Sequence, residues 1–198
     1  MDESVLSEIE KKIAIQCAPV IVGIKIANLL VLNTQEGQYA ATLFHDTELT
    51  LQALCTFESK IYYLLYQPKR LQEYIQQQVV IDYLQDFGYI TYSLESIIHK
   101  VAYKYNRFMY EKKGFPHEIG LLLGYPLKDV SSFIVQEGNG YLYSGYWKVY
   151  DNLPETLIVF SRFRRAKEIL LRLISHGGKL TSVIREVIQY DKKEFCCT

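Results

Sequence analysis

The sequence predicts an α+β fold, a helix-rich single domain with a small sheet of two or three strands. Apolar residues recur every three or four positions along most of the chain, which is the spacing of amphipathic helices. Strand-like patterns are confined to a few short segments. The connections are short, and the sequence contains no linker, internal repeat or low-complexity tract. We therefore expect residues 1–198 to form one domain.

In the first third of the chain, residues 4–16 have helical spacing, and we expect this helix to end at Cys17-Ala18-Pro19. A proline biases the residue before it away from the helical region. The apolar run 20–32 fits a buried strand or a buried helix, and we favour a strand within 24–32, followed by a turn at 33–37. Residues 38–57 are expected to hold one or two helical segments. The segment KIYYLLY at 60–66 is the clearest strand.

In the rest of the chain, residues that favour the start of a helix alternate with glycines that favour its end. Pro68 opens a helix expected over 69–87, which Gly88 ends. Ser93 is suited to cap a helix that runs to about Lys113. The sequence GYLYSGYWKVY predicts a strand, or a hairpin kinked at Gly145. The last helices are expected at 154–176 and 180–189, separated by Gly177-Gly178.

Composition narrows the class of protein. The net charge is zero, which argues against bulk nucleic-acid binding, but residues 1–99 carry a net −6 and residues 100–198 a net +6. No window approaches the length of apolar sequence that spans a membrane. The N-terminus is acidic and amphipathic, unlike a secretory signal. We expect a cytoplasmic protein without membrane insertion.

The four cysteines, Cys17, Cys55, Cys196 and Cys197, form no CxxC pair and no zinc pattern. In a reducing cytoplasm we expect free thiols. No metal site is predicted, and the sequence identifies no cofactor.

The most distinctive stretch is GFPHEIGLLLGYPLKDVSSFI, residues 114–134. Pro116 suits the first turn of a helix, which would place His117 and Glu118 in that turn. A neutral imidazole beside a carboxylate could form an acid–base or ligand pair. The alternative is that Glu118 only caps the helix and His117 only packs.

The same stretch predicts a helix, a tight turn at Gly124 and a second helix. Gly120, Gly124, Val130 and Phe133 have the spacing of DNA-binding helix-turn-helix units, so residues 117–134 could form one. The second helix, however, has few basic residues for reading DNA. We favour the alternative, a plain αα corner.

Three candidates lie near the N-terminus. Cys17 could act as a nucleophile if a base or a positive charge holds it as thiolate, or it could be buried and inert. Lys25 stands within an apolar run, so its amine must be paired, must reach the surface, or must titrate near neutrality. Asn28 shares a face with Lys25 only if the segment is helical.

Two further groups lie in the C-terminal half. Trp147 and Lys148 could line a pocket, although a half-buried strand would look the same. Arg162, Arg165 and Arg172 are expected on one side of a helix whose buried stripe is Val159, Phe163, Ala166, Leu170 and Leu173. These arginines could hold an anion or an acidic partner, or form a solvated face.

Three blocks, CAPVIVGIKIANLL, FPHEIGLLLGYPLKDVSSFI and GYWKVY, together resemble a bacterial family of unknown function found largely in anaerobic Gram-positive organisms. Its signatures are Cys-Ala-Pro and Phe-Pro-His-Glu-Ile-Gly. The resemblance implies no reaction, and at most a redox or iron context, because genes of this family often lie near flavodoxin and iron-transport genes. Gln16 and Ile26 depart from the family pattern, which has histidine and proline there. The first change removes an imidazole beside Cys17.

Three functions remain open. The first is binding of a small-molecule ligand or cofactor in a cleft, with thiol-dependent chemistry. In that case Cys17 would be the nucleophile or a ligand, and His117 the base or a ligand. Glu118 would be the orienting carboxylate, and Lys25 would hold an anion. The second is a helix-turn-helix regulator. The third is a non-enzymatic adaptor for an acidic redox protein or an iron-transport protein. Whether the protein is an enzyme stays open.

Overall fold

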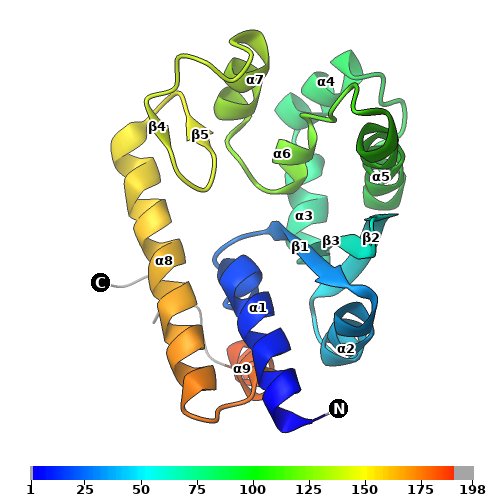
Figure 1. The fold of residues 1–198 in the computed structure, drawn as a ribbon. Helices are drawn as coiled ribbons and strands as arrows, with labels where there is room; N and C mark the ends of the chain where they lie inside the picture. Colours follow the sequence, from blue (N-terminus) through cyan, green and yellow to red (C-terminus); the bar gives the residue numbers. More distant parts are fainter. Residues whose placement is uncertain (1, 190–198) are drawn as a thin grey trace.

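A small antiparallel sheet lies between helices in the computed structural model, which describes residues 2–189 (Figure 1). The strands are β1 (Ala27–Asn33), β2 (Thr50–Phe57), β3 (Lys60–Tyr66), β4 (Tyr143–Ser144) and β5 (Lys148–Val149). The helices are α1 (Glu3–Ile21), α2 (Thr34–Phe44), α3 (Pro68–Ile75), α4 (Gln78–Asp86), α5 (Leu94–Glu111), α6 (Ile119–Leu122), α7 (Leu127–Val135), α8 (Leu153–Ser175) and α9 (Leu180–Gln189). The predicted α+β fold, rich in helix and with a small sheet, is confirmed. Cys196 and Cys197 lie outside the described residues.

The three-stranded sheet has the order β1-β3-β2, and both pairings are antiparallel. The central strand β3 is apolar because both of its faces are covered. Its neighbouring residues Leu64 and Leu65 are fully buried in different apolar clusters, one on each face of the sheet. The predicted strand at 60–66 is therefore the centre of the fold.

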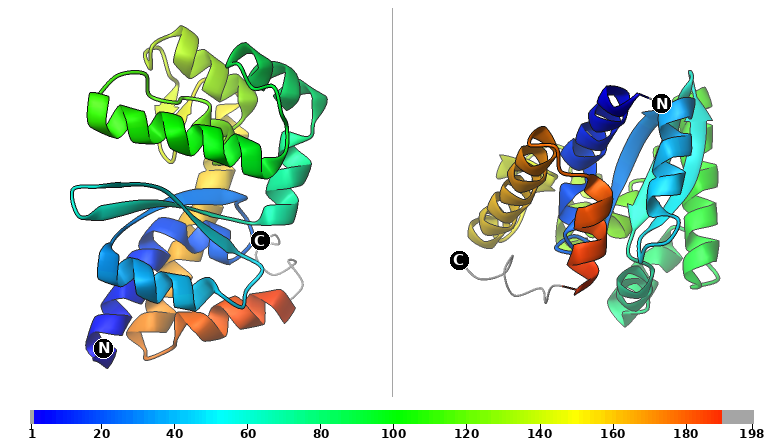
Figure 2. Two further views of the ribbon diagram at one scale, coloured as in Figure 1. Left: turned by 90° about the vertical axis from the view of Figure 1, so that its right-hand side faces the viewer. Right: turned by 90° about the horizontal axis from the view of Figure 1, so that it is seen from below.

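Two helical layers cover the sheet, as the end-on view of Figure 2 shows. Helices α1, α2, α8 and α9 share the apolar cluster on one face, where α1 lies between α8 and the sheet (Figure 2), and α3 to α7 share the cluster on the other face. The β4–β5 hairpin packs on the beginning of α8 through Val149, Phe160 and Phe163. Among residues 2–189, no helix combines the length and apolarity needed to cross a membrane.

The prediction that the first helix ends before Pro19 is wrong. Helix α1 runs through Pro19 to Ile21, although a proline removes one backbone donor from a helix interior. Burial explains the difference, because Cys17, Ala18 and Val20 are fully buried in the core and gain more from packing than the missing bond costs. Cys17 is consequently a helix-interior residue.

The expectation of helix over 38–57 holds only for its first part, which belongs to α2. Residues 50–57 form the edge strand β2, joined to β3 by Glu58 and Ser59. Both turn residues have positive φ, 46° and 61°, as in a two-residue hairpin turn of type I′. Glutamate and serine are unusual in such a turn, so the turn residues themselves do not indicate a hairpin.

Other elements differ in smaller ways. The helix expected over 69–87 is two helices, α3 and α4, separated at Gln76 and Gln77. The Ser93 hydroxyl accepts a hydrogen bond from the amide of Ser96 at 3.2 Å, which confirms the predicted cap of α5. Helix α8 buries Phe160 and Ile174 on its inner stripe rather than Val159 and Leu173.

Candidate functional site

Lys25 lies in the bend that joins α1 to β1. The carbonyl of Pro19 accepts hydrogen bonds from the amides of Ile24 and Lys25, both at 2.9 Å. Gly23 turns the chain with a φ of 80°, a conformation that favours glycine. The bend brings Nζ of Lys25 to Asn28 of β1, so the two residues meet although Lys25 lies in neither a helix nor a strand.

The Lys25 side chain is almost completely buried, with 5% of its surface exposed. Its Nζ donates to the carbonyl of Ala27 at 2.7 Å and to Oδ1 of Asn28 at 2.6 Å. In the part of the chain that the structure describes, no carboxylate forms an ion pair with Lys25. Burial lowers the pKa of Lys25 to about 7, and the nearby Cys17 acts in the opposite direction.

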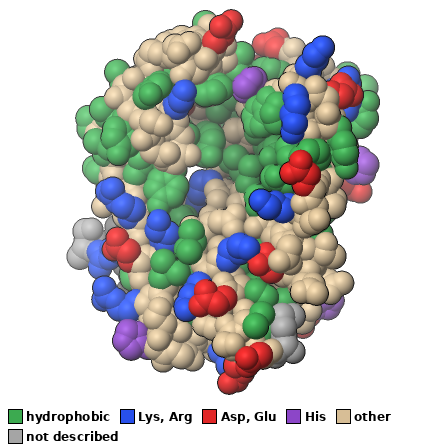
Figure 3. All heavy atoms as spheres, viewed as in Figure 1, with side chains coloured by type: hydrophobic (Ala, Val, Ile, Leu, Met, Phe, Trp, Pro, Cys, Tyr) green, Lys and Arg blue, Asp and Glu red, His purple; other side chains and the backbone are tan. Residues whose placement is uncertain are grey.

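A cleft of about 490 Å³ opens beside Lys25. Its walls come from the α1–β1 bend, α3, α7, the β4–β5 hairpin and the start of α8. Figure 3 shows this face hollowed near its centre, with hydrophobic side chains above the hollow and Lys or Arg side chains around its lower border. Polar and charged residues on the walls are Lys25, Arg70, Lys128, Asp129, Asp151, Asn152, Glu155 and Thr156. The cleft is large enough for a small metabolite.

Asp129 and Trp147 form one rigid wall of the cleft. The buried Asp129 carboxylate accepts from Trp147 Nε1 at 2.7 Å and from the amides of Tyr150 and Asp151 at 2.8 and 3.1 Å. The Trp147 ring stacks on Tyr125, with centroids 5.1 Å apart, and Lys25 Nζ lies 5.2 Å from the Tyr125 centroid. The hairpin, α7 and the Lys25 bend are thus held together at one place.

A second, more apolar cavity of about 280 Å³ lies on the other side of this wall. Trp147 and Asp129 line both cavities, and His117 and Lys148 line only the smaller one. The His117 ring packs between Phe115 and Phe133, with centroid distances of 5.1 and 5.3 Å. Burial lowers the pKa of His117, and the neighbouring Glu118 partly opposes this. Burial therefore favours the neutral form of this imidazole.

Glu118 is buried away from that cavity. Its Oε1 forms an ion pair with Lys104 and accepts a hydrogen bond from the Tyr89 hydroxyl at 3.1 Å. Helix α6 begins at Ile119, and the Glu118 side chain does not cap it. Among the described contacts, none joins the imidazole of His117 to the carboxylate of Glu118 through a hydrogen bond.

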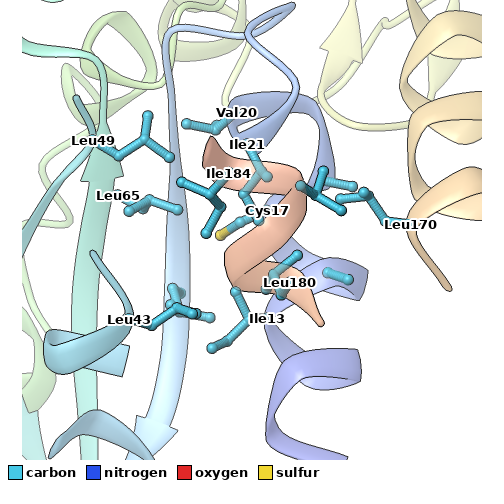
Figure 4. Packing of buried hydrophobic residues seen from close by; sticks show 14 of the residues in the cluster. Ile13, Cys17, Val20, Ile21, Leu43, Leu49, Leu65, Leu170, Leu180 and Ile184 are labelled. Atoms are coloured by element: carbon cyan, nitrogen blue, oxygen red, sulfur yellow. The ribbon is translucent and has the colours of Figure 1, made fainter. Parts of the chain in front are cut away.

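Cys17 lies in the apolar core between α1 and the sheet. Figure 4 shows its sulfur surrounded by aliphatic side chains such as Ile13, Leu43 and Leu65. The side chain is fully buried, and its Sγ is 3.8 Å from the carbonyl of Leu29. Burial raises the pKa of this thiol to about 12, although Lys25 and Asn28 act in the opposite direction. Cys17 lines neither cavity, so the structure does not bring it together with His117.

The predicted helix–turn–helix geometry is present as α6, a turn and α7. Gly124 has a φ of 71°, and a Cβ on Gly120 would lie 2.9 Å from a methyl group of Val130, so the small residue permits the close approach of the two helices. Helix α6 has one turn, and Lys128 is paired with Asp151 at 2.8 Å. These features describe a tight corner that positions Asp129.

Lys25, Asn28 and Trp147 are the predicted site residues that the structure brings together. Lys148 lies nearby, where its Nζ donates to the carbonyl of Gly138 at 2.7 Å. Sequence reasoning missed Arg70, and did not single out Asp129 as the support of Trp147. The position of Asp129 in the first turn of α7 was a weak signal of its role. An acid at that position usually only stabilises the helix, and the two cases look the same in sequence.

Comparisons with known proteins agree with the uncharacterised family that the sequence resembles. The family model described as "Protein of unknown function (DUF3793)" matches residues 13–184, a range that includes every cleft residue named above. Searches of the curated proteins and of the solved structures found no match to the chain.

Proposed function

The chain belongs to the DUF3793 family of proteins of unknown function, and we propose that it binds a small anionic ligand in the cleft beside Lys25. The observation that carries this proposal is a buried lysine on the cleft wall without a carboxylate partner in the described part of the chain. Burying a cation without a counter-charge is costly, so Lys25 gives up its proton near pH 7 unless an anion lies beside it. A bound anion would supply that charge.

Arg70 supports an anion site at the same cleft. Its Nη1 donates to the Gly23 carbonyl and to Oε1 of Gln67, which fixes the side chain at the end of the Lys25 bend. A guanidinium has five N–H donors in a planar fork that matches a carboxylate or phosphate. These two bonds leave donors available for a ligand.

The apolar part of the wall defines the rest of the ligand. Trp147, Phe163 and Val159 also line the cleft. Rings of this kind stack on flat or aliphatic groups. The ligand we propose therefore has one anionic group and a compact apolar or planar body.

This proposal differs from the thiol-dependent site expected from the sequence. Cys17 and Glu118 are buried elsewhere, and His117 lines the neighbouring cavity, so we assign the three no common reaction. The redox or iron context and the cytoplasmic location remain expectations. Including flavin mononucleotide among the ligands tested below addresses the redox context directly.

Trp147 makes binding directly measurable. It is the only tryptophan in the sequence, and it lines the cleft, so its fluorescence reports on occupancy. We would titrate the protein with inorganic phosphate, pyruvate and phenylpyruvate, and follow flavin mononucleotide by calorimetry because it absorbs the emitted light. At least one of these is expected to bind with saturation.

Two substitutions and one control locate the ligand. Lys25→Met and Arg70→Gln should each weaken binding by about tenfold to a hundredfold, the effect of losing one charge-assisted hydrogen bond. Lys69→Met makes the same change at an exposed neighbour of Arg70 outside this cleft and should leave affinity unchanged. Saturable binding that neither cleft variant alters would refute the site, and absence of binding across the panel would refute the ligand class.

A further inference from the structure

The hydrogen bonds of Lys25 match a neutral amine. A neutral lysine side chain has two N–H donors and one lone pair, whereas the ammonium form has three donors and no lone pair. Two acceptors contact Nζ, the Ala27 carbonyl and Asn28 Oδ1. The Tyr125 ring at 5.2 Å offers a weak electrostatic contact but no third acceptor of that kind. A neutral amine would keep both hydrogen bonds and have its lone pair free.

The carboxylates on the cleft wall interact with other groups, so they do not stabilise the ammonium form of Lys25. The Asp129 carboxylate accepts hydrogen bonds from Trp147 and Tyr150, and Asp151 is paired with Lys128. Glu155, the remaining carboxylate on the wall, accepts a hydrogen bond from the side-chain amide of Asn152. The other cations on the wall, Arg70 and Lys128, supply no negative charge to Lys25. The lowered pKa of Lys25, about 7, agrees with this arrangement.

From this geometry we infer that Lys25 forms an imine with the carbonyl group of a small oxo acid whose carboxylate is held by Arg70. Because it requires a ligand in the cleft, this reaction depends on the proposed function. A desolvated amine that is neutral near pH 7 is the nucleophile used by lysines that condense with carbonyl compounds.

The reaction is a condensation without net oxidation. The Nζ lone pair attacks the carbonyl carbon and forms a C–N bond, while the C=O π electrons move to oxygen, which takes a proton. Loss of the second proton from nitrogen and of the hydroxyl group releases one water and leaves a C=N bond. When the imine is protonated it keeps one N–H, which the Ala27 carbonyl or Asn28 Oδ1 can accept.

Reductive trapping tests the inference on the full chain. The protein would be incubated with pyruvate and sodium cyanoborohydride near pH 7.5, digested, and each lysine peptide quantified by mass spectrometry. Lys25 should be modified at least about tenfold faster than the exposed Lys69, because only a neutral amine attacks a carbonyl carbon and burial lowers the pKa of Lys25 to about 7. The preference should disappear in urea, where the cleft is lost.

Two comparisons separate the roles of the residues. Arg70→Gln should slow trapping of pyruvate at Lys25 by about tenfold, the effect of losing one charge-assisted hydrogen bond. The same variant should leave trapping of acetone, which lacks the carboxylate, unchanged. Equal slowing of both probes would remove Arg70 from the proposed carboxylate site.

The outcomes distinguish the imine from the binding site. Preferential trapping at Lys25 would support both. Saturable pyruvate binding reported by Trp147, with modification only at exposed lysines, would overturn the imine and leave the proposed function standing. Binding of inorganic phosphate without any binding or trapping of pyruvate would also exclude an oxo acid. No binding in the whole panel and no selective trapping would overturn both.

Discussion

Asp129 should stabilise the cleft wall by an amount that can be calculated from its contacts. Replacing it by asparagine keeps the size and the Oδ1 acceptor for Tyr150 and Asp151, but puts an NH₂ group against the Trp147 N–H. One buried donor then lacks an acceptor, which costs about 1–3 kcal/mol. Asp129→Ala leaves all three donors without that acceptor and should cost roughly 3–5 kcal/mol.

A double-mutant cycle isolates the Trp147 bond. The free energy of unfolding would be measured by urea titration with circular dichroism, for the wild type, Asp129→Asn, Trp147→Phe and the double variant. Phenylalanine has no N–H, so the penalty for asparagine should fall to less than about half in the Trp147→Phe background. An equal penalty in both backgrounds, or a cost for Asp129→Ala below about 0.5 kcal/mol, would refute this account of the wall.

Three further predictions concern stability and reactivity. In the folded state Lys25 has a pKa of about 7, well below its value in the unfolded chain. The unfolded state therefore binds more protons between pH 7 and 8.5, so the free energy of unfolding should rise over this range, by at most about 1.4 kcal/mol per pH unit. Lys25→Met should remove that slope in urea titrations, and parallel curves for the two proteins would contradict it. Gly120→Ala should lower stability by about 1–3 kcal/mol in thermal unfolding, because the added Cβ would lie 2.9 Å from a methyl group of Val130. Adding Val130→Ala should restore part of this loss. An unchanged stability of Gly120→Ala would show that the two helices can move apart. Cys17 should react with thiol reagents only as fast as the protein unfolds, and rapid labelling of the native protein would disprove its burial.

Much of the fold could be predicted because its local signals agree with the tertiary structure. The apolar strand at 60–66 is the centre of the sheet, and Ser93 and Pro68 begin helices as expected. The edge strand β2 was missed because its hairpin turn uses Glu58 and Ser59, which seldom adopt positive φ. A turn of that kind is imposed by strand pairing and is not visible in the residues themselves.

The candidate site was only partly predictable. A lysine in an apolar run has few structural explanations, so Lys25 could be identified from its neighbours in sequence. Its relation to Arg70 depends on how α3 packs, since Arg70 reaches the Gly23 carbonyl across 47 positions of the chain. The separation of Cys17 from His117 likewise depends on which face of the sheet each helix covers, and spacing along the chain does not determine that.

One proline connects these results. Had α1 ended before Pro19, Cys17 would have been at a helix end beside the apolar run, where a reactive thiol could be exposed. Continuing the helix puts Ile13, Cys17 and Ile21 on one stripe, four residues apart, and that stripe faces the core. The Pro19 carbonyl then accepts the amides of Ile24 and Lys25 and fixes the bend. The continued helix thus keeps the thiol in the core, while the Pro19 carbonyl places Lys25 on the cleft wall, which is why we assign the chemistry of this segment to Lys25.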